Sequence, residues 1–426
     1  MIFRVKKTDI LKGCVEIPAS KSHTIRAVVI ASLSAGQSKI FHPLESLDTM
    51  AAVNACRAFG AKISTEKGFW TVDGFNRNQK RPEKALDLMN SGTSFNLMCG
   101  VAALGNFDVV LDGDESLRTR PVEPLLSALR ELGADAFSIN QNGKPPVKIK
   151  GPVCGGRAKV DGINSQFVSS LLISAPLAAG DTELIAINLH EIPYVKMTLK
   201  WLDSQGIKYE KSEDLSHFYI NGKQEYLPFV REIPGDWSSA TFPLVAAAIT
   251  ESDVLVKGID VNDVQGDKKV IDYLKQFGAC VNEEKQGIRV TKGDLKGLEM
   301  DLNATPDALP AMAVLGCVAE GSTKLFNVPQ ARIKETDRIR VMARELSKMG
   351  ADIQEIEDGL IIRKSFLKGT VVDGHKDHRI VMALTLAGLI ARGETIITTA
   401  ECVSITFPEF FEVMKGLGAN IEIENQ

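Results

Sequence analysis

One pattern recurs six times along the chain: an amphipathic helix that ends at a glycine and is followed by a short strand. The six glycines are spaced by 73, 73, 72, 72 and 68 residues. Each stands where a helix commonly ends on a left-handed residue, a conformation that glycine adopts without a steric cost at Cβ. The glycines are therefore predicted to cap helices and to report on architecture alone. They are Gly60, Gly133, Gly206, Gly278, Gly350 and Gly418.

Each repeat also contains a second helix, which is apolar on all sides and is therefore predicted to be buried. Short apolar or alternating segments between the helices, such as 109–111 and 147–149, are typical of strands. A chain of 426 residues exceeds what one hydrophobic core usually organises. The pattern thus predicts an α/β protein with three repeats in each of two domains. The apolar helices are expected at 27–33, 95–103, 167–179, 240–249, 308–318 and 380–390.

Polar residues mark the beginning of each apolar helix. Ser, Asn and Asp are preferred N-caps, and capping alone would explain the small polar side chains. It does not explain long ones such as Lys21, Arg26 and Arg379. Because helix N-termini offer free N–H groups and a partial positive charge, several of them converging on one cleft would bind a polyanion. We favour this second interpretation over capping alone.

The composition narrows the class of protein. Hydrophobic residues make up 44%, charged residues 24%, and the formal net charge is -4, values that give no reason to expect nucleic acid or a membrane as a partner. The apolar stretch 384–391 is far shorter than the roughly 20 residues of a membrane span. The N-terminus lacks the apolar core of a signal peptide, so a cytoplasmic location is expected. The seven cysteines are scattered, and we interpret them as reduced core thiols.

Seven motifs, in order along the chain, resemble those of the EPSP synthase family of enolpyruvyl transferases. They are PASKS at 18–22 with Arg26, NSGT at 90–93, DGDESLRTRP at 112–121, Pro306-Asp307, RIKETDR at 332–338, DHR at 377–379 and TFP at 406–408. The resemblance extends over essentially the whole chain. It implies the two-domain enolpyruvyl transferase fold, in which each domain has three βαβαββ repeats around buried helices. The first domain would comprise residues 1–18 plus 234–426 and the second 19–233, with the active site in the cleft between them.

The resemblance also implies an activity and a set of site residues. The reaction would be transfer of the enolpyruvyl group of phosphoenolpyruvate to the 5-hydroxyl of shikimate-3-phosphate by addition and elimination, with no cofactor and no metal. The implied catalytic residues are Asp307, Glu335, Lys21 and Lys334. Those implied to bind phosphoenolpyruvate are Lys21, Asn90, Gly92, Arg120, Gln166, Arg338 and Arg379. Those implied to bind shikimate-3-phosphate are Lys21, Ser22, Arg26, Asn164, Ser165, Gln166, Tyr194, Asp307 and Lys334.

These residue types suit that chemistry. Phosphoenolpyruvate carries a phosphate and a carboxylate, so its pocket needs fixed cations, and arginine offers a bidentate geometry that lysine lacks. The addition step needs groups that take and give protons. By resemblance Asp307 works on the acceptor hydroxyl and Glu335 at the methylene carbon. Because Glu335 stands between Lys334 and Arg338, a surface ion-pair network is the competing interpretation.

The chain departs from the family pattern at four positions. Asn96 replaces an arginine, Asn164 a serine, Glu191 a serine and Ile405 a lysine. A carboxylate at Glu191 beside a dianionic phosphate is unfavourable unless it is turned away or paired, and Lys196 is a candidate partner. We expect Ile405 to weaken the hold on phosphoenolpyruvate and a lysine restored there to tighten it.

Three functions stay open on this basis: the EPSP synthase reaction, enolpyruvyl transfer to a different hydroxyl compound, and a non-catalytic binding role. Intact Asp307, Glu335 and Lys334 argue against the last. UDP-N-acetylglucosamine is disfavoured as the acceptor. The related enolpyruvyl transferase that acts on it carries a catalytic cysteine in the loop matching 112–121, and no cysteine occurs there in this chain. The expected partners are the two small-molecule substrates alone, and the protein is expected to be a monomer.

Overall fold

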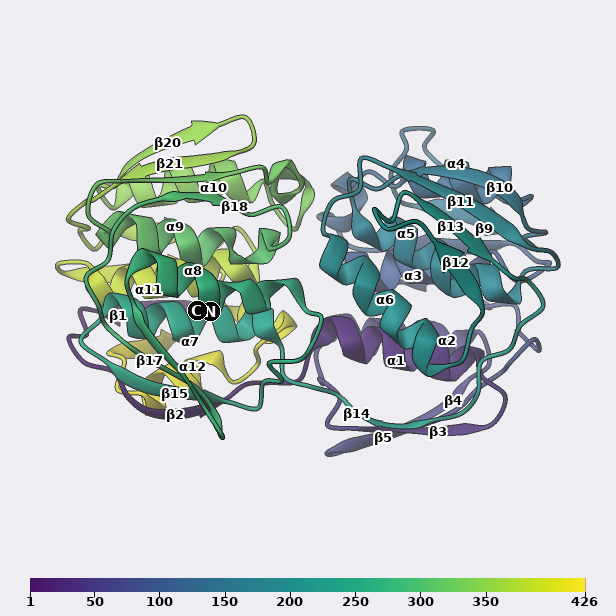
Figure 1. The fold of residues 1–426 in the computed structure, drawn as a ribbon, viewed down its shortest axis with the longest axis horizontal. Coiled ribbons are helices and arrows are strands. Elements are labelled where there is room, and N and C mark those ends of the chain that lie inside the picture. The colour runs from purple at the N-terminus through teal and green to yellow at the C-terminus, as the bar shows by residue number, and fades with distance from the viewer. Residues whose placement is uncertain (426) are drawn as a thin grey trace. The chain divides into compact units, whose positions relative to one another are not determined.

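The chain folds into two units, each with its own core. The computed structural model describes residues 1–425. Unit 1 contains Met1–Pro18 and the chain from Pro234 onward, and unit 2 contains Ala19–Ile233 (Figure 1). Among the described residues no helix combines the length and the apolar content that crossing a membrane requires.

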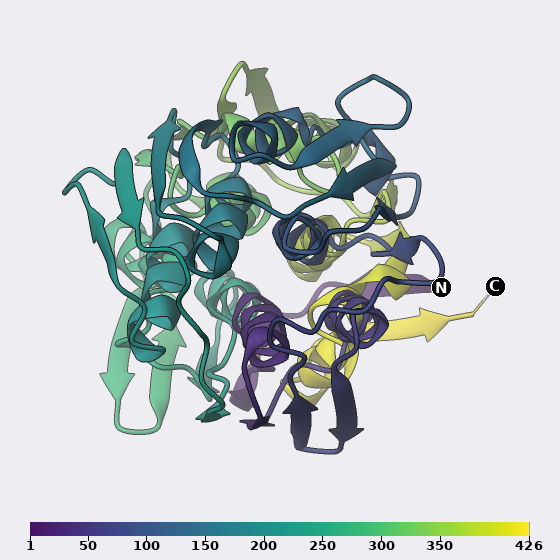
Figure 2. The ribbon, with the colours of Figure 1, turned by 90° about the vertical axis from the view of Figure 1, so that its right-hand side faces the viewer.

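Unit 2 contains three sheets of four strands with one shared topology. Their strand orders are β14-β3-β5-β4, β6-β7-β9-β8 and β10-β11-β13-β12. In each sheet the first pair is parallel and the other two pairs are antiparallel. The strands are β3 (Gln37–Phe41), β4 (Lys62–Glu66), β5 (Phe69–Asp73), β6 (Leu86–Asp87), β7 (Val109–Asp112), β8 (Asp135–Ser138), β9 (Val147–Lys150), β10 (Gly156–Asp161), β11 (Thr182–Ile187), β12 (Tyr209–Lys211), β13 (His217–Ile220) and β14 (Val230–Glu232). The helices are α1 (Lys21–Leu33), α2 (Leu47–Ala58), α3 (Gly92–Ala102), α4 (Glu123–Glu131), α5 (Ser165–Ser174) and α6 (Ile192–Ser204). Figure 2 shows for unit 2 that the sheets lie on the outside and helices lie within them.

Unit 1 repeats this plan. Its sheets have the orders β2-β15-β17-β16, β18-β19-β21-β20 and β22-β23-β1-β24. The strands are β1 (Ile2–Lys6), β2 (Lys12–Glu16), β15 (Asp253–Lys257), β16 (Cys280–Glu284), β17 (Gly287–Thr291), β18 (Glu299–Asp301), β19 (Ser322–Phe326), β20 (Asp352–Ile356), β21 (Gly359–Arg363), β22 (Val371–Asp373), β23 (Glu394–Thr398) and β24 (Ile421–Glu424). The helices are α7 (Trp237–Ile249), α8 (Val270–Phe277), α9 (Leu309–Val318), α10 (Arg338–Lys348), α11 (His378–Ile390) and α12 (Phe410–Gly416).

The order β6-α3-β7-α4-β8-β9 is one complete βαβαββ repeat, and the six sheets confirm the six repeats predicted from the glycine spacing. Two repeats of unit 1 take a strand from the N-terminus. Strand β2 pairs with β15, although all the residues of unit 2 lie between these strands in the sequence. Strand β1 pairs with β23 and β24. These pairings tie the N-terminal segment to unit 1 and make that unit discontinuous in sequence.

The six glycines follow the ends of α2, α4, α6, α8, α10 and α12, and their φ angles run from 68° to 109°. The prediction that they cap helices is therefore confirmed. An L-residue at such a φ angle carries a strain that glycine avoids, which explains why this residue recurs at this point of every repeat.

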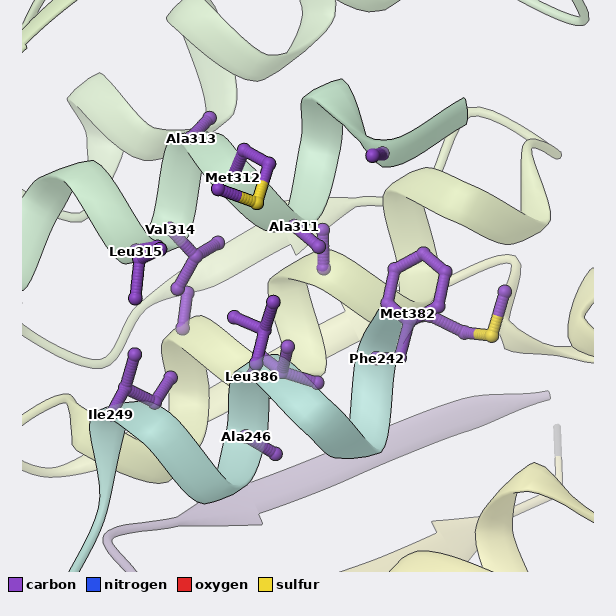
Figure 3. Close-up of a cluster of buried hydrophobic side chains, with 14 of the residues drawn as sticks. Phe242, Ala246, Ile249, Ala311, Met312, Ala313, Val314, Leu315, Met382 and Leu386 are labelled. Atoms are coloured by element: carbon purple, nitrogen blue, oxygen red, sulfur yellow. The ribbon is translucent and has the colours of Figure 1, made fainter. Parts of the chain in front are cut away.

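The apolar helices form the two cores, as predicted. Every residue of α7 is buried. Figure 3 shows side chains of α7, α9 and α11 packed together in unit 1, among them Phe242, Met312 and Leu386. Burying a side chain of this size stabilises the fold by about 1.5–3 kcal/mol. The bounds differ from the expectation chiefly at two points. Helix α1 begins at Lys21 and not at 27. Helix α5 ends at Ser174 and a 3₁₀ turn follows, since Pro176 has no N–H with which to continue the helix.

The prediction that all the cysteines are core thiols is wrong for three of them. All seven are free, but Cys14, Cys154 and Cys280 are exposed. Cys14 lies on β2 beside the buried Val15, and the two-residue alternation of a strand points it outward. For the buried Cys56, loss of hydration raises the pKa of the thiol to about 12.

Two cap glycines of unit 1 provide a test of this architecture. Gly350→Ala should lower the free energy of unfolding by about 1 kcal/mol, because φ is 90° and the space around the new Cβ is open. Gly278→Ala should lower it further, since its Cβ would also clash with the backbone oxygen of Asp294. Urea unfolding monitored by circular dichroism measures both. Equal effects would show that steric contact at Gly278 is unimportant.

Candidate functional site

A buried guanidinium organises the polar residues of unit 1. The Arg338 side chain is 1% exposed and contacts three carboxylates. Nη1 donates to Asp307 Oδ1 at 2.7 Å, Nη2 to Glu335 Oε2 at 2.7 Å and Nε to Asp377 Oδ2 at 2.8 Å. Bonds between charged partners are roughly twice as strong as neutral ones. We call these four residues the Arg338 cluster.

The cluster joins the N-terminal ends of three helices. Arg338 is the first residue of α10, and Asp307 lies in the 3₁₀ turn that leads into α9. Asp377 is the N-cap of α11, where its Oδ1 accepts from the backbone N–H of Arg379 at 2.9 Å. Glu335 is only 11% exposed. Glu335 thus forms the ion pair with Arg338 that the competing interpretation expected, but the pair is not on the surface. Removing Arg338 would leave three partly or fully buried carboxylates without their shared cation.

The charges around Asp307 determine its protonation. Burial raises the pKa of this carboxyl group, but Arg338, Lys334 and Arg379 together hold it well below its usual range. A carboxyl group whose pKa falls on folding stabilises the folded state above the unfolded pKa, about 4 for aspartate, and loses that contribution as the pH drops further. Asp307 is consequently ionised at neutral pH and can accept a proton.

Arg379 is also buried, at 2% exposed, but its guanidinium is only partly paired. Nη2 lies 3.6 Å from Asp307 Oδ2 and 3.8 Å from Asp236 Oδ2. Within residues 1–425, Nε and Nη1 have no hydrogen-bond partner. Buried N–H groups are nearly always paired in native proteins, so these two donors are suited to an anionic ligand.

In unit 2 a second arginine lies against a glycine at a helix start. Arg120 Nη2 donates to Asn90 Oδ1 at 2.5 Å and to Ser116 Oγ at 3.2 Å. A Cβ atom on Gly92 would lie 2.9 Å from Arg120 Nη1. Any larger residue at Gly92 would therefore displace the guanidinium from the N-terminus of α3.

Gln166 connects α5 to α3. Its Nε2 donates to Thr93 Oγ1 at 3.0 Å, and its Oε1 accepts from Asn96 Nδ2 at 2.8 Å. Asn164 caps α5 by accepting from the Gln166 backbone N–H at 3.0 Å. Asn96, which replaces the arginine of the family pattern, thus orients a neighbouring amide and adds no charge.

Arg26 is a buried cation that only neutral groups surround. It is 1% exposed, and its guanidinium donates to Thr198 Oγ1, Ser169 Oγ and the backbone oxygens of Ser22 and Tyr194 at 2.9–3.3 Å. In the part of the chain that the structure describes, no ion pair joins it to a carboxylate. Burial lowers the pKa of the guanidinium to about 10. Charge neutralisation by an anionic ligand would offset this cost of desolvation.

Lys21, the first residue of α1, is paired with a residue that the sequence interpretation missed. Its Nζ lies 2.8 Å from Asp48 Oδ2, and the Asp48 side chain is 3% exposed. Asp48 belongs to the first turn of α2, which Ser46 caps. An acidic residue in a capped first turn usually serves the helix dipole, and nothing local in the sequence identifies Lys21 as its partner.

Glu191 is buried and paired. It precedes α6 with a left-handed φ of 53°, and its Oε2 accepts from Ser165 Oγ at 2.7 Å. Lys196, the partner suggested by the sequence, is exposed. The bond engages the Ser165 hydroxyl proton, so the lone pairs of the Ser165 oxygen are what remains to accept a hydrogen bond from another group.

Ile405 does not match the expectation made for it. The side chain is 7% exposed and belongs to the hydrophobic core of unit 1, at the end of a 3₁₀ helix over Ala400–Ile405. A lysine here would have to bring its ammonium out of the core before it could reach a ligand. We therefore no longer expect a lysine at position 405 to tighten the binding of phosphoenolpyruvate, and expect it to destabilise the fold.

The structure thus groups the residues named from sequence into two sets, one in each unit. Unit 1 holds Asp307, Lys334, Glu335, Arg338 and Arg379, and unit 2 holds Lys21, Ser22, Arg26, Asn90, Gly92, Arg120, Asn164, Ser165, Gln166 and Tyr194. The sequence analysis named Asp377 in the DHR motif without a role, and it identified neither Asp48 nor Asp236 as an acidic partner. Residues 1–425 contain no group of three or more His, Cys, Asp or Glu side chains with the geometry of a metal site.

Comparisons with known proteins agree over nearly the whole chain. The family model described as EPSP synthase (3-phosphoshikimate 1-carboxyvinyltransferase) matches residues 5–414. The 3-phosphoshikimate 1-carboxyvinyltransferase of Acetivibrio thermocellus is 52% identical, with 99% of each chain covered. That of Ruminiclostridium cellulolyticum is 48% identical over 99% of this chain and 100% of the relative. The solved EPSP synthase of Acinetobacter baumannii is 31% identical and superimposes with a TM-score of 0.83 over 100% of both chains.

The position of Ile405 provides a prediction. Ile405→Lys should lower the free energy of unfolding by about 2–4 kcal/mol, because it places an ammonium among apolar side chains. Ile405→Leu, of equal volume, is the control and should cost less than about 1.5 kcal/mol. Thermal unfolding measures both. A lysine variant as stable as the leucine variant, with a lower Michaelis constant for phosphoenolpyruvate, would show that this side chain faces the ligand.

Proposed function

The chain belongs to the EPSP synthase family, and on that premise we propose that it transfers the enolpyruvyl group of phosphoenolpyruvate to the 5-hydroxyl of shikimate-3-phosphate. The products are 5-enolpyruvylshikimate-3-phosphate and inorganic phosphate. The two relatives named above carry the name of this activity, and the match covers 99% and 100% of their lengths.

The observation that carries the proposal is the state of the buried arginines. Arg26 has no carboxylate partner among the described residues, and two nitrogens of Arg379 lack hydrogen-bond partners. Arg120 Nε is likewise buried and unpaired. Each substrate carries one phosphate and one carboxylate, so the pair brings four anionic groups. Guanidinium groups with free donors suit such ligands through bidentate bonds.

In this proposal residues of unit 2 bind both substrates, and residues of unit 1 bind phosphoenolpyruvate and carry out the proton transfers. In unit 2, Arg26 and the polar ends of α1 and α5 hold shikimate-3-phosphate. The residues assigned to it there are Lys21, Ser22, Arg26, Asn164, Ser165, Gln166 and Tyr194. The residues assigned to phosphoenolpyruvate are Lys21, Asn90, Gly92, Arg120 and Gln166 of unit 2 and Arg338 and Arg379 of unit 1.

The proton transfers fall to the carboxylates of the Arg338 cluster. In the addition step the 5-hydroxyl attacks C2 of phosphoenolpyruvate, Asp307 accepts the hydroxyl proton, and Glu335, which enters this step in its protonated form, delivers that proton to C3. In the elimination step C3 returns a proton to Glu335 while the bond from C2 to the phosphate oxygen breaks, and the proton held by Asp307 passes to the released phosphate, which restores both carboxyl groups to their starting states. Both carboxylates bond to one guanidinium, which keeps the two proton-transfer groups close together and in fixed orientation.

Substrate binding would also adjust Asp307. Its pKa is low because Arg338, Lys334 and Arg379 surround it. An anionic group bound to Lys334 or Arg379 offsets part of that positive charge and raises the pKa of Asp307 toward its usual value. The carboxylate therefore becomes a stronger base when substrate is present.

The test is Glu335→Gln, which keeps the shape of the side chain and cannot carry a proton through the cycle. Formation of product from shikimate-3-phosphate and phosphoenolpyruvate should slow by about 10²-fold or more, while the affinity for shikimate-3-phosphate, measured by titration calorimetry, barely changes. Glu299→Gln, at an exposed glutamate of the same unit, should behave as the wild type.

Two results would contradict the proposal. Near-normal turnover of Glu335→Gln would reassign this residue to structure. A wild-type protein that binds phosphoenolpyruvate but makes no product with shikimate-3-phosphate would point to a different hydroxyl acceptor.

A further inference from the structure

Glu345 is a fully buried carboxylate outside the set of residues that the reaction uses. It lies on α10, and its side chain is 0% exposed. Arg344 Nε donates to it at 2.9 Å, Lys348 Nζ at 2.6 Å and the backbone N–H of Asp373 at 3.0 Å. His375 Nε2 lies 3.0 Å away, and the same imidazole also contacts Arg344 Nη2. Glu345 therefore joins its own helix to the segment 373–376.

That segment has a strained backbone. His375 and Lys376 are consecutive non-glycine residues in the left-handed region, with φ of 53° and 57°. Such conformations persist only where surrounding contacts hold them. Asp373 Oδ1 accepts from the His375 N–H at 2.9 Å, and the Lys376 N–H donates to Thr399 Oγ1 at 3.1 Å. Together with Glu345, these bonds determine the path of the chain up to residue 377.

The segment leads directly into the Arg338 cluster. Asp377 follows Lys376, bonds to Arg338 and caps the helix at Arg379. Arg338 and Glu345 are seven residues apart on α10, which is two turns and places them on the same side of the helix. Helix α10 thus holds the segment at two points, through Arg338 to Asp377 and through Glu345 to His375 and Asp373.

We propose that Glu345 and His375 are positioning residues. They fix the segment 373–376 on α10, so that Asp377, the next residue, orients Arg338 and Arg379 for phosphoenolpyruvate. The inference rests on the proposed function. Neither residue touches substrate in this assignment. Their effect passes through Asp377 to the two guanidinium groups.

One substitution at His375 tests the contacts of the imidazole while leaving the left-handed backbone conformation in place. Asparagine tolerates the left-handed conformation but is too short to replace the imidazole between Arg344 and Glu345. His375→Asn should raise the Michaelis constant for phosphoenolpyruvate about tenfold or more and leave the dissociation constant of shikimate-3-phosphate within about twofold. Glu345→Gln, which keeps the volume, should act in the same direction.

Lys376→Asn is the matched control. Lys376 is the adjacent left-handed residue, and its side chain is exposed. This variant should keep wild-type constants for both substrates. Hydrogen exchange of a peptide covering 373–381 adds a readout that needs no activity: exchange at the start of α11 should quicken in His375→Asn and stay as in the wild type in Lys376→Asn.

The outcomes separate the two proposals. A wild-type protein without product formation refutes the proposed function, and faster exchange in His375→Asn alone would then still support the positioning role. The inference is overturned if His375→Asn leaves the phosphoenolpyruvate constant and the exchange unchanged, or if it weakens both substrates equally. It is also overturned if Lys376→Asn produces the same changes. Should Glu345→Gln fail to fold, the His375→Asn results decide.

Discussion

The structure of the candidate site in unit 1 depends on one buried cation bound by three carboxylates. Arg338 joins Asp307, Glu335 and Asp377, which belong to three different segments of the chain. Desolvating four charges is unfavourable, and only close, well-oriented bonds offset that cost. The same bonds align the N-terminal ends of α9, α10 and α11 and keep Asp307 ionised. In the proposed mechanism, stability and proton transfer therefore depend on the same set of contacts.

The other arginines serve a different purpose. Arg338 is paired inside the protein, whereas Arg26 and Arg379 keep hydrogen-bonding capacity or positive charge that the protein does not neutralise. Apolar helices make this division possible, because they bury the bases of the side chains and leave the guanidinium groups at helix N-termini. In the proposed function Arg338 fixes the catalytic carboxylates and also contributes to binding phosphoenolpyruvate, whereas Arg26 and Arg379 serve the ligands alone.

The sequence predicted the features that local chemistry determines. Glycine spacing located all six repeats, and the apolar composition of one helix in each repeat located the buried helices. Pairings between distant residues could not be predicted. Lys21 and Asp48, or Glu345 and His375, meet only because the fold brings α1 to α2 and α10 to the segment before α11. Ile405 was misjudged for a related reason, since its motif marks a position in the sequence and does not reveal that the side chain turns into the core.

The most direct test of the Arg338 cluster is carbon-13 NMR of protein labelled at the aspartate carboxyl groups, with the Asp307 signal assigned by its loss in Asp307→Asn. As the pH is lowered, the wild-type Asp307 signal should keep the shift of an ionised carboxylate below pH 3.8, the ordinary value for aspartate. Arg338→Gln should raise the pKa of Asp307, because burial then opposes ionisation with less compensation. A wild-type Asp307 that titrates at or above the ordinary value would contradict the central role assigned to Arg338.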